Sequence, residues 1–353
     1  MAETSIRPKV RDQRLDFAKG ILILFVVLGH CVQISYRGSH EFYNNWLFKF
    51  IYSFHMPAFM MISGWLFYSS RQRPFIDIIK IKIRQLGIPF LAFCALCYTT
   101  LTAFSILTTD STPSPLQVIW GFKSYVVNSH AMWFLASVLI NSCIVTITPS
   151  QHKYSILLWG VAVASLFIPN NAYVFPEFVY MFPFFLGGYY IHRNGRYILT
   201  GLNWPHAILF FIISVGGLIF FNKETYIYTS KISLIVNQPI HQLLVDIHRF
   251  ATGLSISILF FALISKIPNK ALSSTTGLWI SQCGKSSLAI YGFQNFIIFL
   301  LTGKLISYFQ YDGTHRTLLI ASIACFVMIL CQFAIYVCKR SRILSCLFCG
   351  SKL

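Results

Sequence analysis

Residues 14–36 decide how the rest of the chain is interpreted, and they read Arg-Leu-Asp-Phe-Ala-Lys-Gly-Ile-Leu-Ile-Leu-Phe-Val-Val-Leu-Gly-His-Cys-Val-Gln-Ile-Ser-Tyr. From Gly20 onward this stretch is long and apolar enough to enter a bilayer. It carries one ionisable group deep inside, His30, and has Lys19 at its leading edge. Eleven residues separate the two, which on an α-helix is about three turns plus roughly 20° and about 16 Å of rise. Lys19 and His30 are therefore predicted to lie on one face of a helix.

The composition predicts an integral membrane protein. The 353 residues are 56% hydrophobic and 11% charged, whereas a typical soluble domain has about 25% charged residues. No stretch is polar enough for a separate soluble domain, so residues 1–353 are expected to form one polytopic membrane domain. The basic N-terminus runs into an apolar segment without a small-residue cleavage site, which argues against a cleaved signal peptide.

Apolar segments along the chain predict an all-α fold with about ten transmembrane helices, each near the about 20 residues that a bilayer core requires. Lys and Arg gather in alternate connections, which by the positive-inside rule places both termini in the cytoplasm. Residues 1–17 then form a cytoplasmic segment, 339–353 a cytoplasmic tail and 222–248 the longest outer loop, in which 230–245 is apolar enough to re-enter the membrane. The predicted spans are 18–37, 46–68, 86–108, 131–149, 154–170, 174–192, 205–221, 249–266, 284–303 and 317–338.

The net charge of +18 follows from this topology better than from a nucleic-acid partner, because the cations fall in short clusters between apolar spans. The densest cluster runs from Arg71 to Arg84 and is interpreted as an inner loop leading into the third span. A phosphate-bearing ligand that enters from the cytoplasm would need such cations.

A second histidine is predicted to lie near His30. It belongs to Phe54-His55-Met56-Pro57 in the next span, which runs in the opposite direction and brings His55 within a few ångströms of the depth of His30. The pair favours proton handling, although a histidine hydrogen-bonded between helices stays an open interpretation. Zinc would lack a third ligand, so no metal is expected. Pro57 is expected to kink this span, and Ser63 offers a hydroxyl further along it.

Several stretches together resemble the membrane acyltransferase-3 family, and more narrowly its branch of fucose 4-O-acetylases and related sugar O-acetyltransferases. The resemblance covers the whole chain and depends on the combination in order. Near the ninth span the family often has Ser…Ile-Tyr-x-x-His, whereas this chain has Gln294 at the last position. An acid or base role there is in doubt, although an amide still donates a hydrogen bond. The matching pieces are Lys19 with His30, the Phe-His-Met-Pro…Ile-Ser-Gly-Trp-Leu run at 54–66, Ile88-Pro89-Phe90, Met-Trp-Phe-Leu at 132–135 and Phe-Phe-Leu-Gly-Gly-Tyr at 184–189.

The resemblance implies an O-acetyltransferase of a bacterial inner membrane that moves acetyl from acetyl-CoA to a sugar hydroxyl of a surface polysaccharide or its lipid-linked precursor. It implies His30 as general base, with His55 or Ser63 orienting it or stabilising the oxyanion. Transfer through an acetyl-histidine, other short acyl donors, the leaflet of the acceptor and a homodimer stay open. A transporter or flippase for a lipid-linked or small acyl compound is the alternative function. The candidate donor-binding residues are Lys19, Arg14, Arg71, Arg73, Lys80 and Arg84, and the candidate acceptor-binding residues are Trp65, Trp133 and Gln294.

Overall fold

The computed structural model describes residues 11–36, 40–71, 73–109, 113–128, 132–148, 154–169, 177–228, 232–302 and 313–351, and these contain helices and connecting coil but no strand. The all-α prediction is confirmed for this part of the chain. The helices are α1 (Gln13–Ser35), α2 (Trp46–Ser70), α3 (Phe75–Lys82), α4 (Ile88–Thr109), α5 (Pro115–Asn128), α6 (Trp133–Ile147), α7 (Ser155–Ala164), α8 (Glu177–Arg193), α9 (Trp204–Ile219), α10 (Pro239–Ser265), α11 (Asn269–Leu272), α12 (Thr275–Lys285), α13 (Ser287–Thr302), α14 (Gly313–Arg340) and α15 (Arg342–Cys349).

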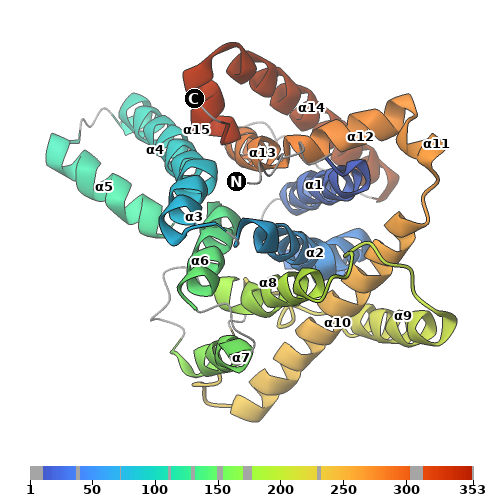
Figure 1. Ribbon diagram of the computed structural model, residues 1–353. Helices are drawn as coiled ribbons and strands as arrows, with labels where there is room; N and C mark the ends of the chain where they lie inside the picture. Colours follow the sequence, from blue (N-terminus) through green and yellow to red (C-terminus); the bar gives the residue numbers. More distant parts are fainter. Residues whose placement is uncertain are drawn as a thin grey trace, which may run out of the picture.

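Helices α1 and α2 lie side by side in the middle of the bundle, with α12, α13 and α14 on one side and α8 and α10 on the other (Figure 1). Each begins at a side-chain cap. The Asp12 carboxylate accepts hydrogen bonds from the backbone N–H groups of Arg14 and Leu15, and the Asn45 side chain accepts one from Phe48. Such caps satisfy donors that the first turn leaves without partners. The two helices run antiparallel, as the sequence predicts.

Glycines bring α2 and α8 into backbone contact. A Cβ atom at Gly64 would lie 1.9 Å from the Phe185 carbonyl oxygen, and one at Gly188 would lie 1.8 Å from the Met61 carbonyl oxygen. No other residue fits at either position, because each backbone occupies the space that a side chain would need. This crossing fixes α2 against the bundle and thereby fixes the direction in which His55 points.

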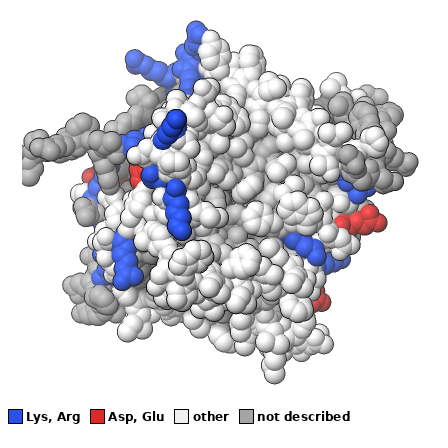
Figure 2. Space-filling view, turned by 90° about the vertical axis from the view of Figure 1, so that its right-hand side faces the viewer, with Lys and Arg blue, Asp and Glu red and all other residues white. Residues whose placement is uncertain are grey.

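Five stretches are long and apolar enough to cross a membrane: Gln13–Ser35, Trp46–Ser70, Phe75–Thr108, Pro239–Ser265 and His315–Arg340. Four shorter apolar helices match further predicted spans, namely Trp133–Ile147, Ser155–Phe167, Trp204–Ile219 and Ser287–Leu301. Figure 2 shows Lys and Arg gathered at two opposite sides of one face, more densely at one of them, with a broad uncharged band between. Such a band suits contact with lipid, and the count of ten spans stays a prediction.

The structure adds helices that the sequence did not predict and shortens one predicted loop. The basic stretch is mostly helical, because α3 begins at Phe75 and continues through a π-helical turn, Ile83–Gly87, into α4. The predicted outer loop ends at Pro239, where α10 begins, so part of the expected re-entrant stretch is the first turns of that helix. Helices α5 and α12 were not expected. The tail contains α15, whose Phe348 ring packs 5.1 Å from that of Phe93.

Candidate functional site

The face of α1 that carries Lys19 and His30 lines two internal cavities. Its contributing side chains recur at intervals of four, three, four and three residues, which keeps them on one stripe of a helix. We call the cavity that contains Lys19 the inner cavity and the one that contains His30 the central cavity. The stripe consists of Lys19, Ile23, Val26, His30 and Gln33.

Helix α2 lines the same two cavities in the opposite order, as an antiparallel neighbour must. Its first turns face the central cavity and its later turns face the inner cavity. His55 therefore lies on the same cavity wall as His30, at the level that the sequence predicts. From the central to the inner end, the lining side chains of α2 are Tyr52, His55, Met56, Phe59, Ile62, Ser63 and Leu66.

Three side chains belong to both cavities: Val26 from α1, Met56 from α2 and Tyr291 from α13. The inner cavity has a volume of about 150 Å3, and the central cavity has one of about 250 Å3. We call the three shared residues the junction. A molecule that occupied both cavities would contact these three residues.

A hydrogen-bonded series of side chains follows the central cavity. The Tyr52 hydroxyl donates to Gln33 Oε1 at 2.8 Å, and Gln33 Nε2 donates to the Tyr226 hydroxyl at 2.8 Å. The Tyr52 ring also lies near both histidines, with its centroid 6.4 Å from that of His30 and 5.0 Å from that of His55. Burial raises the pKa of the Tyr226 phenol, so this hydroxyl keeps its proton at neutral pH.

The two histidines are held differently. His55 Nδ1 lies 2.6 Å from the Ile51 carbonyl oxygen, and because a carbonyl only accepts, Nδ1 carries the hydrogen and Nε2 of the neutral ring keeps its lone pair. His30 lines the cavity and has no hydrogen-bond partner among the described residues. Both rings can therefore offer a nitrogen lone pair to a molecule in the central cavity, which is the property of a general base.

A comparison with protein families decides the class. Residues 12–337 match the model of the family described as Acyltransferase domain, Acyl_transf_3, which covers α1 through most of α14. This chain belongs to that family. It is an acyltransferase, and with its long apolar helices it is a multi-pass membrane protein.

Two curated relatives of this acyltransferase carry the name Nodulation protein NolL. The one from Mesorhizobium japonicum is 27% identical over 299 residues, covering 82% of this chain and 78% of the relative. The one from Sinorhizobium fredii is 32% identical over 240 residues, covering 66% of this chain and 64% of the relative. No solved structure matches the acyltransferase.

Six cations were predicted to bind the donor. Of these, Lys19 alone lines one of the two cavities. Its Nζ atom forms an ion pair of 2.8 Å with Asp16, which also pairs with Arg11 at 2.5 Å. Arg14 instead donates hydrogen bonds to carbonyl oxygens at the end of α10, those of Ser265 and Ile267 among them. These bonds satisfy acceptors that the last turn of a helix leaves open.

The other predicted cations lie away from both cavities. Arg71 donates to the Thr148 carbonyl oxygen, Arg73 and Lys80 are exposed, and Arg84 is partly buried in the π-helical turn. None of them lines the inner or the central cavity as described.

Of the three predicted acceptor-binding residues, one lines a cavity and two do not. Trp133 lies on the wall of the central cavity. Trp65 lies outside both cavities, where its indole stacks on His192 at 4.3 Å and donates to the Arg196 carbonyl oxygen. Gln294 is fully buried and donates to the Tyr291 carbonyl oxygen at 3.2 Å, and its neighbour Asn295 is the amide that lines the cavity. The described residues contain no group of three side chains that could hold a metal.

Sequence reasoning missed six polar or aromatic side chains of the central cavity. Gln33 follows His30 by three residues and Tyr52 precedes His55 by three, so helical spacing alone could have found both. Tyr291 and Asn295 lie four residues apart on α13, and the same argument would have grouped them once Tyr291 was placed. Tyr226 and Tyr228 come from a connection between helices, where no periodic signal exists.

Proposed function

We propose that this acyltransferase moves an acetyl group from acetyl-CoA to a sugar hydroxyl of a bacterial surface polysaccharide or its lipid-linked precursor, with His30 as the general base. One observation carries the proposal. A cavity with a lysine and a cavity with two histidines lie end to end and share the junction residues Val26, Met56 and Tyr291. Two substrates that enter from opposite ends would meet there.

The inner cavity suits the donor. Apart from Lys19, Ser63, Ser287 and Tyr291, its described wall is apolar, which suits a long, flexible thioester arm. Lys19 stands at the end of α1 where the chain begins, and a cation there would attract the phosphates of coenzyme A. His30 lies about 16 Å further along the helix axis, a distance of the same order as the pantetheine arm. The thioester would then lie at the junction.

The central cavity suits a sugar. Its wall combines aromatic rings, which cover the apolar faces of a pyranose, with the amides of Gln33 and Asn295, which bind hydroxyl groups. No carboxylate or lysine lines the described wall, so a neutral ring fits it better than a charged one.

The proposed chemistry is a direct transfer between the two substrates. A ring nitrogen of His30 removes the proton of the sugar hydroxyl while its oxygen forms an ester bond to the acetyl carbon and the carbon–sulfur bond breaks. The thiolate of coenzyme A takes the proton from the imidazolium, so no proton is gained or lost. A positioned base of this kind contributes about 10²–10⁴-fold to the rate. His55, with Nε2 as an acceptor, is placed to bind the same hydroxyl or a neighbouring one.

The remaining parts of the proposal concern the membrane. We place the Lys19 end of the bundle in the cytoplasm of a bacterial inner membrane, where acetyl-CoA is made, with ten spans and both termini inside. The gathering of Lys and Arg in alternate connections of the chain, those next to Lys19 among them, supports this orientation.

The test uses membranes that contain the full chain, [14C]acetyl-CoA and surface polysaccharide extracted from a strain in which the gene is deleted. We expect label in the polysaccharide, released by mild base as expected for an ester, and an acetyl signal in the NMR spectrum of wild-type polysaccharide that is absent from the deletion strain. Label that crosses the membrane without reaching saccharide would instead support the transporter function, and unlabelled polysaccharide with identical spectra would contradict the proposal.

A further inference from the structure

The connection between α9 and α10 supplies part of the central cavity. Residues 222–228 run across the end of the bundle opposite Lys19, and Tyr226 and Tyr228 line the cavity from there. The Tyr226 ring centroid lies 5.4 Å from that of Tyr52 on α2, and the Tyr228 centroid lies 5.8 Å from that of Trp133 on α6. We call residues 222–228 the tyrosine loop. It joins walls that come from two different helices.

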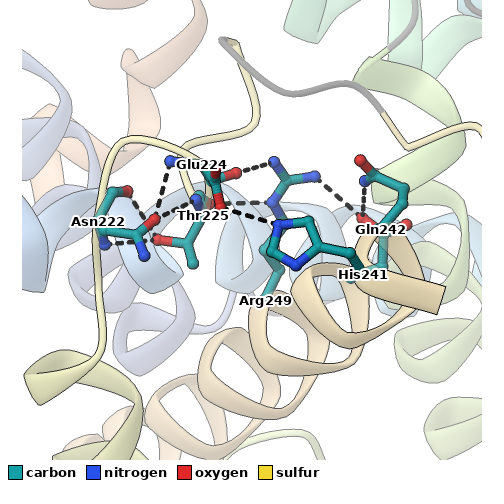
Figure 3. Close-up of polar contacts among 7 residues, drawn as sticks. Asn222, Glu224, Thr225, His241, Gln242 and Arg249 are labelled. Carbon is teal, nitrogen blue, oxygen red and sulfur yellow. Dashed lines mark hydrogen bonds and ion pairs between the residues drawn. The ribbon is translucent and has the colours of Figure 1, made fainter. Parts of the chain in front are cut away.

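Arg249, on α10, binds the backbone of the tyrosine loop. Its Nε atom donates to the Thr225 carbonyl oxygen at 3.0 Å, and its Nη2 atom donates to the Glu224 carbonyl oxygen at 2.5 Å (Figure 3). The Asn222 side chain accepts from the backbone N–H groups of Glu224 and Thr225, so the Glu224–Thr225 peptide is held at its N–H by Asn222 and at its carbonyl by Arg249. The guanidinium therefore binds the backbone immediately before Tyr226.

Arg249 is itself held in a fixed position. Its Nη1 atom pairs with Asp246 Oδ1 at 3.0 Å, and Gln242 donates to the same carboxylate oxygen at 3.0 Å. The Arg249 side chain is 2% exposed and that of Asp246 is 4% exposed. A buried ion pair in an apolar helix carries a large desolvation cost and is weak evidence for stability alone. Its geometry instead matches a specific task, because a guanidinium can bind two successive carbonyls and a carboxylate at once.

Hydrogen bonds and ring contacts connect the tyrosine loop to the two histidines. The Tyr226 hydroxyl accepts from Gln33, Gln33 accepts from Tyr52, and the Tyr52 ring lies beside His30 and His55. We propose that Arg249 is a positioning residue for acyl transfer: by holding the tyrosine loop it places Tyr226 and, through Gln33, sets the shape of the acceptor end of the central cavity. This inference rests on the proposed function for the identity of the acceptor end.

Arg249→Lys is the central test, because lysine keeps the charge beside Asp246 but cannot bind both loop carbonyls. We expect it to lower kcat/KM for the extracted polysaccharide by about tenfold, as for the loss of one hydrogen bond to a charged group, through a higher KM. The KM for acetyl-CoA, which enters from the other end, should stay the same. Arg193→Met is the matched control, since Arg193 contacts Ser155 and Tyr190 between α8 and α7, away from both cavities.

A double-mutant cycle separates positioning from a general structural effect. Tyr226→Phe removes the hydroxyl that binds Gln33, so if Arg249 acts through Tyr226, adding Arg249→Lys to this variant should lower kcat/KM by much less than in the wild type. The inference would be overturned if the fold-losses in kcat/KM of the two single variants multiplied to give that of the double variant. Equal changes in the KM values of both substrates would also overturn it.

Amide hydrogen exchange gives a readout independent of activity. Peptides that cover 222–228 should exchange faster in Arg249→Lys than in the wild type or in Arg193→Met, while peptides of α1 stay unchanged. Unchanged exchange in the loop would refute the holding of residues 222–228 by Arg249, which we call the clamp, even if activity fell. Conversely, faster exchange in a protein that transfers no acetyl group to polysaccharide would leave the clamp intact and refute the proposed function.

Discussion

The inner and central cavities share three residues and differ in almost everything else. The inner wall has one cation, Lys19, and is otherwise mostly aliphatic and aromatic. The central wall has His30, His55, two amides, Trp133 and four tyrosines. The same two helices line both cavities, so the change occurs within single helical stripes. Along α1 the wall changes between Val26 and His30, about one turn apart.

This difference indicates two ligands of different chemistry rather than one ligand that crosses the whole path. A transported molecule would meet an apolar passage followed by a polar one, and neither would suit all of it. A thioester arm and a hydroxyl-bearing ring each suit one cavity, and their reacting atoms would meet at the junction. The family match supports the same division, because an acyltransferase needs both a donor and an acceptor.

Removing the base should have the largest effect. We expect His30→Ala to lower acetyl transfer by about 10²–10⁴-fold, the contribution of a positioned general base, without changing the amount of protein in the membrane. The measurement is transfer of label from [14C]acetyl-CoA to polysaccharide. His206→Ala is the control, because His206 is exposed at the start of α9. Full activity of His30→Ala would remove the histidine from the mechanism.

Blocking the junction should come next. In Val26→Phe the added ring would occupy the space between the two cavities, and misplacing the reacting groups by about 1 Å can lower a rate by roughly 10²-fold. We expect kcat to fall while both substrates still bind, measured by steady-state kinetics and by isothermal titration with acetyl-CoA. Leu24→Phe, two residues earlier on the other side of the helix, should leave kcat unchanged. Equal losses in both variants would mean that overpacking of α1, and not the junction, is responsible.

The sequence predicted the parts of the site that depend on helix geometry. Lys19, His30 and His55 were placed correctly because a fixed rise and a fixed turn determine which residues share a face and a depth. Trp133 was named through the family resemblance of Met-Trp-Phe-Leu at 132–135, whereas the other three came from helix geometry. These predictions needed one helix, or two helices joined by a short connection, and no information about more distant parts of the chain.

The parts that failed depend on contacts between distant segments. Arg14 looked like a ligand for phosphate, but carbonyl oxygens about 250 residues away in the sequence bind its guanidinium. Gln294 appeared to replace a functional histidine, yet it faces the packed interior while Asn295 faces the cavity. The tyrosine loop carries no periodic pattern at all. The one signal for it was Asp246 and Arg249, a pair of opposite charges three residues apart in an otherwise apolar stretch.

Removing the cation of the inner cavity should have the smallest effect of the three and distinguishes the two cavities most directly. Lys19→Met should raise the KM for acetyl-CoA by about tenfold, since a charge-assisted hydrogen bond contributes roughly 1.5–3 kcal/mol, and should leave the KM for polysaccharide unchanged. Lys19 also pairs with Asp16, so a higher KM could instead reflect a carboxylate deprived of one partner. Adding Asp16→Asn to Lys19→Met separates the two causes: a KM that stays high assigns the effect to the lost cation. Recovery of the wild-type KM would show that Lys19 acts on Asp16 alone, and the inner cavity would then have no demonstrated group for binding the phosphates of the donor.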